Sequence, residues 1–343
     1  MKILIFSRFF APHIGGVEKH IQKISEILLK KGFKVVLITE KFEDNLSEQE
    51  NIDGIEVYRI NLFKNLNLLK LNKFLIWYWL FKNFRLIKEA DIVHCHDIFF
   101  WYLPFRFLFP KKPVYITFHG WEGIFPIPKR YILARKIWEK LAWGNICVGE
   151  YLSKWYGTKP SFVSYGGAEV RKEEPKVSNK NKIVFIGRLE KDVGLPVYFK
   201  TLNILKRNKI DLEIEFCGDG ALRKEAEKYG KVFGFTKNIL TKITKSNFIF
   251  ASSYLSIIEA MNFKRLVISV WEDLLKKDYL LLSPFRDFLI AGSDPEKISE
   301  KILYFLNHPE EEKKLVEKAY NWARTQTWEK VADLYLKLWK IKR

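Results

Sequence analysis

Residues 2–21, KILIFSRFFAPHIGGVEKHI, carry the pattern that decides the fold. The apolar run at the start of this stretch is typical of a buried strand, and Gly15 and Gly16 follow it after a short loop. Apolar residues then recur every three or four positions up to Gly32, which indicates a helix with one buried face: Val17, Ile21, Ile24 and Leu28. A strand that leads through a glycine turn into a helix begins a βαβ unit, so we expect a parallel sheet.

The same alternation continues along the chain and then starts again. In the first half, strands are expected at residues 2–7, 34–39, 56–60, 91–95, 113–117 and 145–148. A polar stretch at 171–182, RKEEPKVSNKNK, is typical of a linker, and further strands are expected after it at residues 183–187, 213–217, 232–235, 248–251 and 266–270. Because 343 residues fit two domains, we predict an α/β fold of two Rossmann-like domains whose parallel sheets face a cleft.

The composition indicates a globular protein of a reducing compartment. Hydrophobic residues make up 48% of the chain, and the three cysteines, Cys95, Cys147 and Cys217, are widely spaced and odd in number. This pattern fits neither a disulfide framework nor a zinc site. The longest apolar run, residues 74–81, is far shorter than a membrane-spanning helix, and the first apolar run is too short for a signal peptide. We therefore expect a cytoplasmic protein.

The net charge of +19 concentrates in one region. Between residues 59 and 88 there are seven basic residues and no acidic one, interleaved with Leu, Phe, Trp and Tyr. One interpretation is a solvated face over a core helix. The other is an amphipathic surface that binds anionic lipid headgroups at the inner face of a membrane. Nucleic-acid binding is the least favoured, because no nucleic-acid motif accompanies the charge.

Histidines stand at the ends of two predicted strands in the first half. The motif DIVHCHD contains His94, His96 and Asp97, and TFHG contains His119. In an open parallel sheet, ligands bind at the carboxyl ends of the strands. We expect His94 in the core and His96 and Asp97 at the rim. His119 is the preferred functional histidine, because the glycine after it leaves room for a substrate, and the spacing of these residues fits no metal site.

In the second half, glycine-rich strand ends carry cationic and acidic side chains. Arg188, in GRL, offers a fork of donors that matches phosphate oxygens, and Lys191 adds a second charge. The motif CGDG contains Gly218, and SSYLSIIEAM contains Ser256 and Glu259. The Glu259 carboxylate is placed to accept hydrogen bonds from ribose hydroxyls. The alternative for this residue is an acid in the first helical turn that the helix dipole favours.

These stretches, in this order, resemble glycosyltransferase family 4, the retaining GT-B enzymes of glycosyl transferase group 1. The matching stretches are FFAPHIGGVEKH, DIVHCHD, TFHG, GRL, CGDG, SIIEAM, AGSDPEKISEKI and TWEKVADLYLKLW. They span almost the whole chain, and their joint order and spacing are specific although each is modest alone. The resemblance implies an acceptor domain at residues 1–168, a nucleotide-sugar donor domain at 169–326, and a last helix at 327–343 that returns to the first domain.

The resemblance also implies roles for single residues. His119 would lie beside the transferring sugar and the acceptor hydroxyl, and Gly15 and Gly16 would form the loop over the donor diphosphate. Arg188 would pair with that diphosphate, and Glu259 would hold the nucleotide ribose. Members of the family need neither a metal nor a cofactor, since the nucleotide sugar is a substrate. The other donor-binding candidates are Lys191, Gly218 and Ser256.

The sequence departs from the family pattern in the donor domain. Ala251 replaces the first glutamate of the Glu-x7-Glu pair, which helps to hold the donor sugar. The lysine expected five residues after Arg188 is Val193, which leaves Lys191 as the substitute. Beyond EAM, the family commonly has a glycine and a proline where this chain has Lys264 and Leu266.

The sequence thus predicts a metal-independent, retaining glycosyltransferase that moves a sugar from a nucleotide-sugar donor onto a glycan or lipid-linked acceptor near an anionic membrane. No nucleic-acid partner is expected. The alternative is a catalytically weakened scaffold that acts as a membrane-surface binding or regulatory protein, which the loss of donor-binding residues favours. Other double-Rossmann enzymes, such as epimerases and phosphorylases, form a third class.

Overall fold

The computed structural model describes residues 1–120, 124–169, 181–210, 212–236 and 239–341. The chain forms two compact units, and each has its own sheet. The first unit comprises Met1–Ser164 together with Trp328–Arg343, and the second comprises Tyr165–Thr327. These limits stand four residues and one residue from the divisions expected after residues 168 and 326. Residues 171–180 of the predicted linker lie outside the described residues.

The first unit contains an eight-stranded sheet in the order β3-β4-β2-β1-β5-β6-β7-β8. All neighbouring strands run parallel except β3, which pairs with β4 in the antiparallel sense. The six strands predicted in this half are all present, with ends that shift by at most one residue. The strands are β1 (Lys2–Phe6), β2 (Lys34–Glu40), β3 (Gln49–Ile52), β4 (Ile55–Ile60), β5 (Ile92–His96), β6 (Val114–Phe118), β7 (Asn145–Val148) and β8 (Phe162–Ser164).

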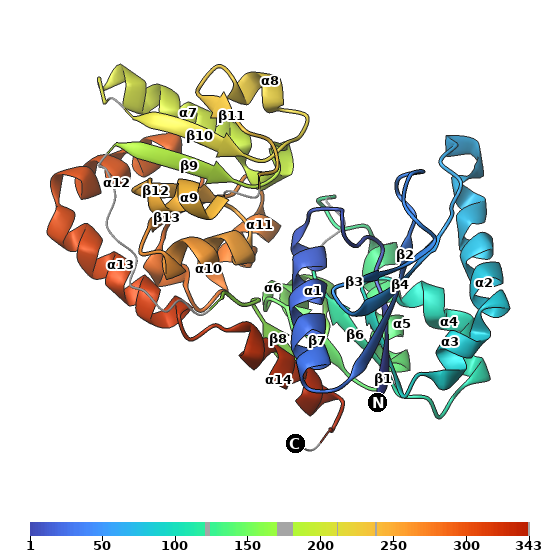
Figure 1. Ribbon diagram of the computed structural model, residues 1–343. Helices are drawn as coiled ribbons and strands as arrows, with labels where there is room; N and C mark the ends of the chain where they lie inside the picture. The colour runs from blue at the N-terminus through green and yellow to red at the C-terminus, as the bar shows by residue number, and fades with distance from the viewer. Residues whose placement is uncertain (121–123, 170–180, 211, 237–238, 342–343) are drawn as a thin grey trace. The chain divides into compact units, whose positions relative to one another are not determined.

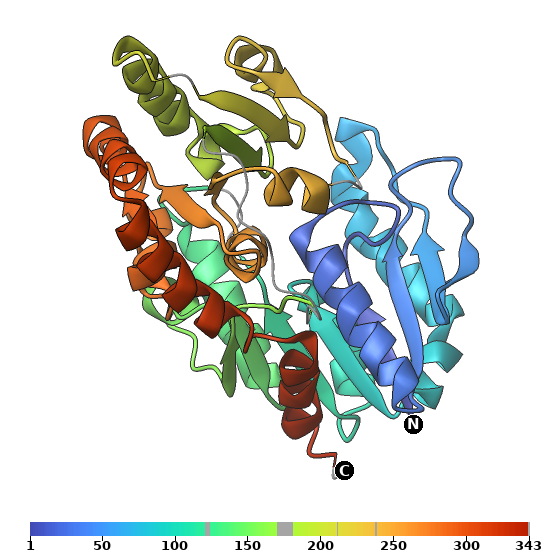
Figure 2. The same cartoon turned by 60° about the vertical axis from the view of Figure 1, so that its left-hand side comes forward.

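Helices cover both faces of this sheet, which is why its central strands β5 and β6 are buried along their whole length. Figure 1 shows α1 and α14 on one face and α2, α3 and α4 on the other. The C-terminal helix α14 contacts α1 and β8, and Figure 2 shows it beside the first sheet. The helices are α1 (Gly16–Lys30), the 3₁₀ helix η1 (Leu66–Leu71), α2 (Asn72–Lys82), α3 (Phe84–Glu89), α4 (Phe99–Leu108), α5 (Lys129–Leu141), α6 (Tyr151–Tyr156) and α14 (Trp328–Leu338).

The second unit contains a six-stranded sheet, parallel throughout, in the order β11-β10-β9-β12-β13-β14. Two parallel-dominated sheets confirm the prediction of two Rossmann-like domains. The strand predicted at 232–235 is wrong in extent, because β11 ends at Val232. The strands are β9 (Lys182–Ile186), β10 (Glu213–Cys217), β11 (Lys231–Val232), β12 (Phe248–Ala251), β13 (Leu266–Val270) and β14 (Ile290–Gly292).

The helices of the second unit pack in pairs around the sheet: α7 contacts α12, and α10 contacts α13. Nothing in the described part of the chain is a helix both long and apolar enough to cross a membrane. The elements are η2 (Lys191–Val193), α7 (Leu195–Arg207), α8 (Arg223–Ala226), α9 (Ile239–Thr244), α10 (Tyr254–Asn262), α11 (Leu274–Leu281), η3 (Arg286–Phe288), α12 (Pro295–Asn307) and α13 (Pro309–Ala323).

Candidate functional site

Each sheet has one point where the strand order reverses. In the first unit this point lies between β1 and β5, and in the second it lies between β9 and β12. At such a switch point the connections leave in opposite directions, which opens a crevice at the carboxyl ends of the strands. The predicted site residues all follow strands at or near these two points: Gly15, Gly16, His119, Arg188, Lys191, Gly218, Ser256 and Glu259.

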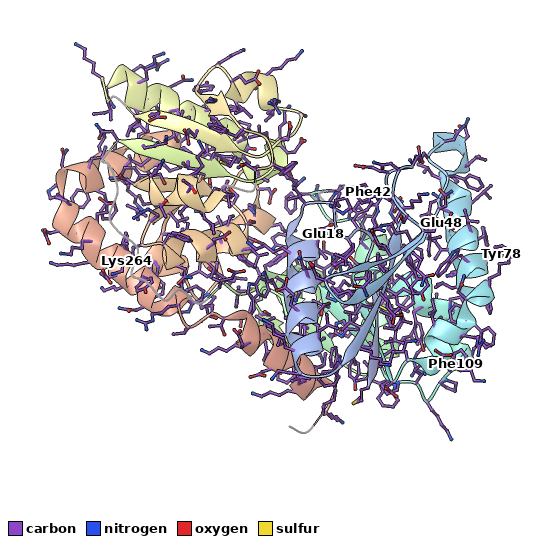
Figure 3. All side chains as sticks on the ribbon, in the orientation of Figure 1. Glu18, Phe42, Glu48, Tyr78, Phe109 and Lys264 are labelled. Atoms are coloured by element: carbon purple, nitrogen blue, oxygen red, sulfur yellow. The ribbon has the colours of Figure 1, made fainter. Side chains whose placement is uncertain are left out.

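The glycine pair begins helix α1, as the sequence predicts. Gly15 is the residue before the helix and Gly16 is its first residue. The side chain of Glu18 folds back over this turn, since a Cβ atom on Gly15 would lie 2.1 Å from Glu18 Oε2. Figure 3 labels Glu18 at the N-terminal end of α1. Burial raises the pKa of the Glu18 carboxyl group, and His13 Nδ1 lies 2.9 Å from Glu18 Oε1. The diphosphate-binding role of the two glycines stays a prediction.

Four of the six histidines gather beside the switch point of the first unit. They are His20 from α1, His94 and His96 from β5, and His119 after β6. His96 Nδ1 lies 2.7 Å from His119 Nε2, and the ring of His20 meets that of His119 edge-on with 4.8 Å between centroids. Burial lowers the pKa of His20 and of His94 to about 3. Burial also sets the pKa values of His96 and His119 well below 6.5, so all four rings are neutral at pH 7.

A chain of hydrogen bonds connects this cluster to Tyr335 of helix α14 and to Trp339, which follows that helix. The indole Nε1–H of Trp339 only donates, so His94 Nδ1 accepts from it at 3.1 Å and His94 carries its proton on Nε2. His94 Nε2 then donates to Thr117 Oγ1 at 2.8 Å. Thr117 Oγ1 also lies 2.9 Å from Tyr335 Oη, and Tyr335 Oη lies 2.8 Å from His20 Nε2. The bond from Trp339 thus fixes the tautomer of His94.

The prediction for His94 is confirmed, because it is a buried residue with both ring nitrogens bonded. The prediction that His96 lies at the rim is wrong. His96 is the last residue of β5 and is only 3% exposed, because the ring of His119 lies 5.0 Å away and covers it. His119 itself is half-buried, and its backbone N–H donates to the Asp97 carboxylate at 3.1 Å. Arg135 Nη2 lies 3.7 Å from the same carboxylate.

In the second unit, the loops after β9 and β10 continue to pair beyond the sheet. Gly187 N–H donates to Cys217 O at 3.2 Å, and Leu189 N–H donates to Asp219 O at 2.8 Å. Gly218 lies between these bonds with φ +155°, and a Cβ atom there would stand 1.7 Å from Gly187 O. Only glycine allows the two backbones to approach so closely. This pairing presents the neighbouring residue, Arg188, to solvent.

The Arg188 side chain is 60% exposed, and its Nη2 pairs with Asp192 Oδ2 at 2.7 Å. Lys191 is exposed at the start of η2. Across the switch point, Ser252 Oγ donates to Val193 O at 2.8 Å. This bond holds the loop after β9 against the loop after β12, at the carboxyl ends of the two strands.

The two remaining candidates lie on α10. Ser256 is buried, and its hydroxyl lies 2.7 Å from Ser253 Oγ and 2.9 Å from Ser253 O. Glu259 is the sixth residue of the helix and half-buried. The alternative of a first-turn acid is therefore wrong, since the first turn of α10 contains no acidic residue. Ala251 ends β12 and is fully buried, with two residues between it and α10.

The structure adds two residues that the sequence pattern does not single out. His20 joins the histidine cluster through its place on the buried face of α1, next to Ile21. Lys276, on α11, is buried beside the carboxyl end of β12, where its Nζ donates to Ser252 O. A lysine in WEDLLKKDYL gives no signal of burial, because its neighbour Lys277 is exposed and identical in chemistry.

The three cysteines are free and buried. Burial raises the pKa of the Cys147 and Cys217 thiols to about 11. Among the residues that the structure describes, no three His, Cys, Asp or Glu side chains gather in a way that could hold a metal ion.

Comparisons with known proteins give a family match for each of the two units. Residues 14–160 match the family Glycosyltransferase Family 4, and residues 168–322 match Glycosyl transferases group 1. The gpi3 subunit of phosphatidylinositol N-acetylglucosaminyltransferase from Schizosaccharomyces pombe is 31% identical over 26% of this chain, and the match spans 20% of that subunit. An uncharacterized glycosyltransferase of Methanocaldococcus jannaschii is 25% identical over 99% of this chain and 98% of its own.

Solved structures share the fold at low sequence identity. Sucrose-phosphate synthase from Thermosynechococcus elongatus superposes with a TM-score of 0.77 at 15% identity, over 99% of this chain and 100% of that one. The two family matches follow one another along residues 14–160 and 168–322, and each falls on one Rossmann-like unit. The chain therefore belongs to the GT-B glycosyltransferases in which a family 4 domain precedes a group 1 domain.

Proposed function

We propose that this glycosyltransferase takes its sugar from a nucleoside-diphosphate sugar, retains the anomeric configuration, and uses an acceptor that is anchored at a membrane surface. The observation that carries the donor assignment is Arg188, an exposed guanidinium at the switch point between β9 and β12. The close approach of the backbone at Gly218 holds the loop that presents it. Planar guanidinium donors match diphosphate oxygens in pairs.

In this proposal some residues bind the leaving group and others bind the sugar. Charge develops on the diphosphate as the bond to the sugar breaks, and Arg188 stabilises that charge by hydrogen bonds that strengthen as it grows. Glu259 holds the ribose, with Lys191, Gly218 and Ser256 as further donor contacts. His119, a neutral imidazole at pH 7, hydrogen-bonds to the sugar or acceptor hydroxyl. No metal and no cofactor take part.

A membrane-surface acceptor is supported by the outer face of α2, α3 and α4. Nine of the twenty large exposed hydrophobic side chains of the described residues lie between residues 63 and 108. We call them the α2–α4 surface, and Figure 3 shows one of them, Tyr78, pointing outward from α2. They are Phe63, Leu69, Leu71, Phe74, Tyr78, Phe81, Phe84, Phe107 and Leu108.

Charge on the same face favours an anionic lipid as its partner. Of the seven basic residues between 59 and 88, Arg59 is buried and paired with Glu50, and the other six are exposed. Lys73 and Lys82 lie over the rings of Phe74 and Tyr78. Aromatic rings among cations are typical of helices that lie in the headgroup region. The S. pombe relative is named a phosphatidylinositol N-acetylglucosaminyltransferase subunit, which supports a lipid-linked acceptor and a peripheral location at the inner face of a membrane.

The replacement of a family glutamate by Ala251 favours a second candidate, a weakened scaffold that binds membranes or regulates another protein. Ala251 is fully buried and brings no polar group to the donor crevice. A nucleotide-binding measurement separates the two candidates, because a scaffold that has lost its donor site binds no nucleoside diphosphate.

The test of the proposed function is Arg188→Ala, assayed for donor turnover with UDP-, GDP- and ADP-sugars. Loss of one preorganised donor costs about 3–4 kcal/mol in the transition state, so turnover should fall at least about a hundredfold. The control is Arg286→Ala: this arginine is also exposed and pairs with an aspartate, but it precedes the edge strand β14, whereas Arg188 follows the central strand β9. A fall of less than about threefold for Arg188→Ala would remove this residue from the mechanism.

A further inference from the structure

Lys276 is a buried cation whose side-chain contacts are all neutral. The residue is 6% exposed, in the first turn of α11, where Asp273 Oδ1 accepts from its backbone N–H at 2.7 Å. Its Nζ donates to the backbone carbonyl of Ser252 and lies 4.0 Å from the centroid of the Tyr279 ring. An ammonium group has three donors, and neither contact supplies a negative charge.

No carboxylate of the described residues lies within 4.0 Å of Lys276 Nζ. The charged groups that face it from the neighbouring elements are Arg188 before η2, Asp192 within η2, and Asp273 before α11. Asp192 is already paired with Arg188. Burial lowers the pKa of Lys276 to about 7, because removing the ammonium from water is not repaid by a near anion. The charged form of such a buried lysine is stabilised most by a bound anion that is not part of the protein.

The position of Lys276 in the second unit is suited to the binding of such an anion. Ser252 is the first residue after β12, and it connects two partners: its carbonyl accepts from Lys276 and its hydroxyl donates to Val193 O at 2.8 Å. Two hydrogen bonds therefore separate Lys276 Nζ from η2, the turn that follows Arg188. The ammonium thus stands beside the carboxyl end of β12, next to the switch point at which an open parallel sheet binds its ligand.

We propose that Lys276 binds the diphosphate of the donor together with Arg188, as a second cation that α11 supplies from a buried position. This assignment rests on the proposed function. Tyr279 and the Ser252 carbonyl hold the ammonium in place before the ligand arrives, so little side-chain freedom is lost on binding. Arg188 remains exposed and fixes the diphosphate from the solvent side of the crevice.

The experiment is calorimetry of UDP, GDP and ADP binding at pH 8 in two buffers with different ionisation enthalpies. Nucleoside diphosphates are fully ionised at this pH, whereas a lysine whose pKa is about 7 is mostly neutral. A bound diphosphate raises the pKa of a neighbouring ammonium, so the wild-type protein should take up as much as about 0.9 proton per ligand. Lys276→Met should take up none and bind at least about tenfold more weakly at pH 7.

The matched control is Lys277→Met, which removes the same charge from the exposed face of the same helix and should leave both quantities unchanged. Binding by the wild type without proton uptake, or Lys276→Met binding as tightly as the wild type, would overturn the assignment of Lys276. Failure of the wild type to bind any of the three nucleotides would instead overturn the proposed function. The uptake measurement on the wild type stands even where Lys276→Met does not fold.

Discussion

At the scale of single residues, Gly218 sets the geometry that Arg188 depends on. Its φ of +155° is a conformation that side-chain-bearing residues rarely adopt, and a Cβ atom would collide with the backbone oxygen of Gly187. That oxygen belongs to the loop after β9 and cannot rotate away as a side chain would. Substitution therefore has to part the two loops and displace Arg188.

Gly218→Ala should lower the free energy of unfolding of the second unit by more than about 4 kcal/mol, the range of the most damaging single substitutions. Gly234→Ala is the control within the same unit. Gly234 also has a positive φ, +67°, but the nearest atoms to its Cβ position are side-chain atoms 3.7 and 3.8 Å away. The substitution Gly234→Ala should lower the free energy of unfolding by only about 1–2 kcal/mol, which is the strain of the left-handed conformation alone. Urea unfolding followed by circular dichroism measures both, and equal losses would show that the approach to Gly187 is not what requires glycine.

The sequence allowed the strand-end residues to be predicted but not their burial. Arg188 and His119 follow strands, which a local pattern reveals. His96 looked like a rim residue because nothing near it in the chain indicates that the ring of His119 covers it. The hydrogen-bond partners of His94 and His20, Trp339 and Tyr335, lie 245 and 315 residues away along the chain. The burial of Lys276 was not predicted for the same reason, because its environment is formed by Ser252 and η2, which lie elsewhere in the chain.

At the scale of elements, the α2–α4 surface should bind anionic vesicles. Phe74 and Tyr78, 55% and 58% exposed, lie on the outer face of α2 among lysines. Transfer of a large side chain out of water contributes about 1.5–3 kcal/mol when complete. Replacing both by serine should therefore weaken binding to phosphatidylglycerol-containing vesicles by about tenfold or more in a sedimentation assay.

The dependence of vesicle binding on salt and on lipid charge is a second test of the membrane proposal. Salt screens the charge of exposed lysines. Binding should therefore fall by about several-fold or more as the ionic strength rises from ~0.05 to ~0.5 M. Leu240→Ser is the matched control, since Leu240 is also an exposed apolar residue but lies on α9 of the second unit. Equal binding to neutral phosphatidylcholine vesicles, or no binding to either kind, would contradict the membrane proposal.

Elements were predictable where the apolar run was continuous. Strand β12, with the sequence FIFA, keeps its expected ends because all four of its residues are apolar and buried. The strands that were not predicted are short or polar: β3 is QENI, an antiparallel edge strand, and β14 has three residues. Such strands form because a neighbour offers hydrogen-bonding groups, so their own sequence carries little signal.

At the scale of the whole molecule, the chain leaves its first unit and comes back to it. The resemblance in TWEKVADLYLKLW implied that the last helix returns, and α14 does belong to the first unit. Sequence periodicity alone could not have shown this, because an amphipathic helix reveals that it has a buried face but not which partner covers it. That partner is α1, more than 300 residues earlier in the chain.

Removal of α14 should therefore unfold the first unit and spare the second. Trp328, Tyr335 and Trp339 are each at most 5% exposed, and a buried aromatic side chain of about 150–250 Å² contributes several kcal/mol at about 25 cal/mol per Å². Together they approach the whole stability of an ordinary domain, about 5–15 kcal/mol. Truncation before Trp328 also leaves His20 and His94 without the hydroxyl and indole that bond them.

Hydrogen exchange read by mass spectrometry distinguishes the two units in one sample. In the chain truncated before Trp328, peptides from β1 and β5 should lose their protection by orders of magnitude, because both strands rely on the core that α14 covers, while peptides from β9 and β12 should keep theirs. A chain truncated after Lys340 retains all of α14 and is the control. Unchanged protection in β1 and β5 would mean that the first sheet is stable without α14, and loss of protection in all four strands would mean that the two units unfold as one.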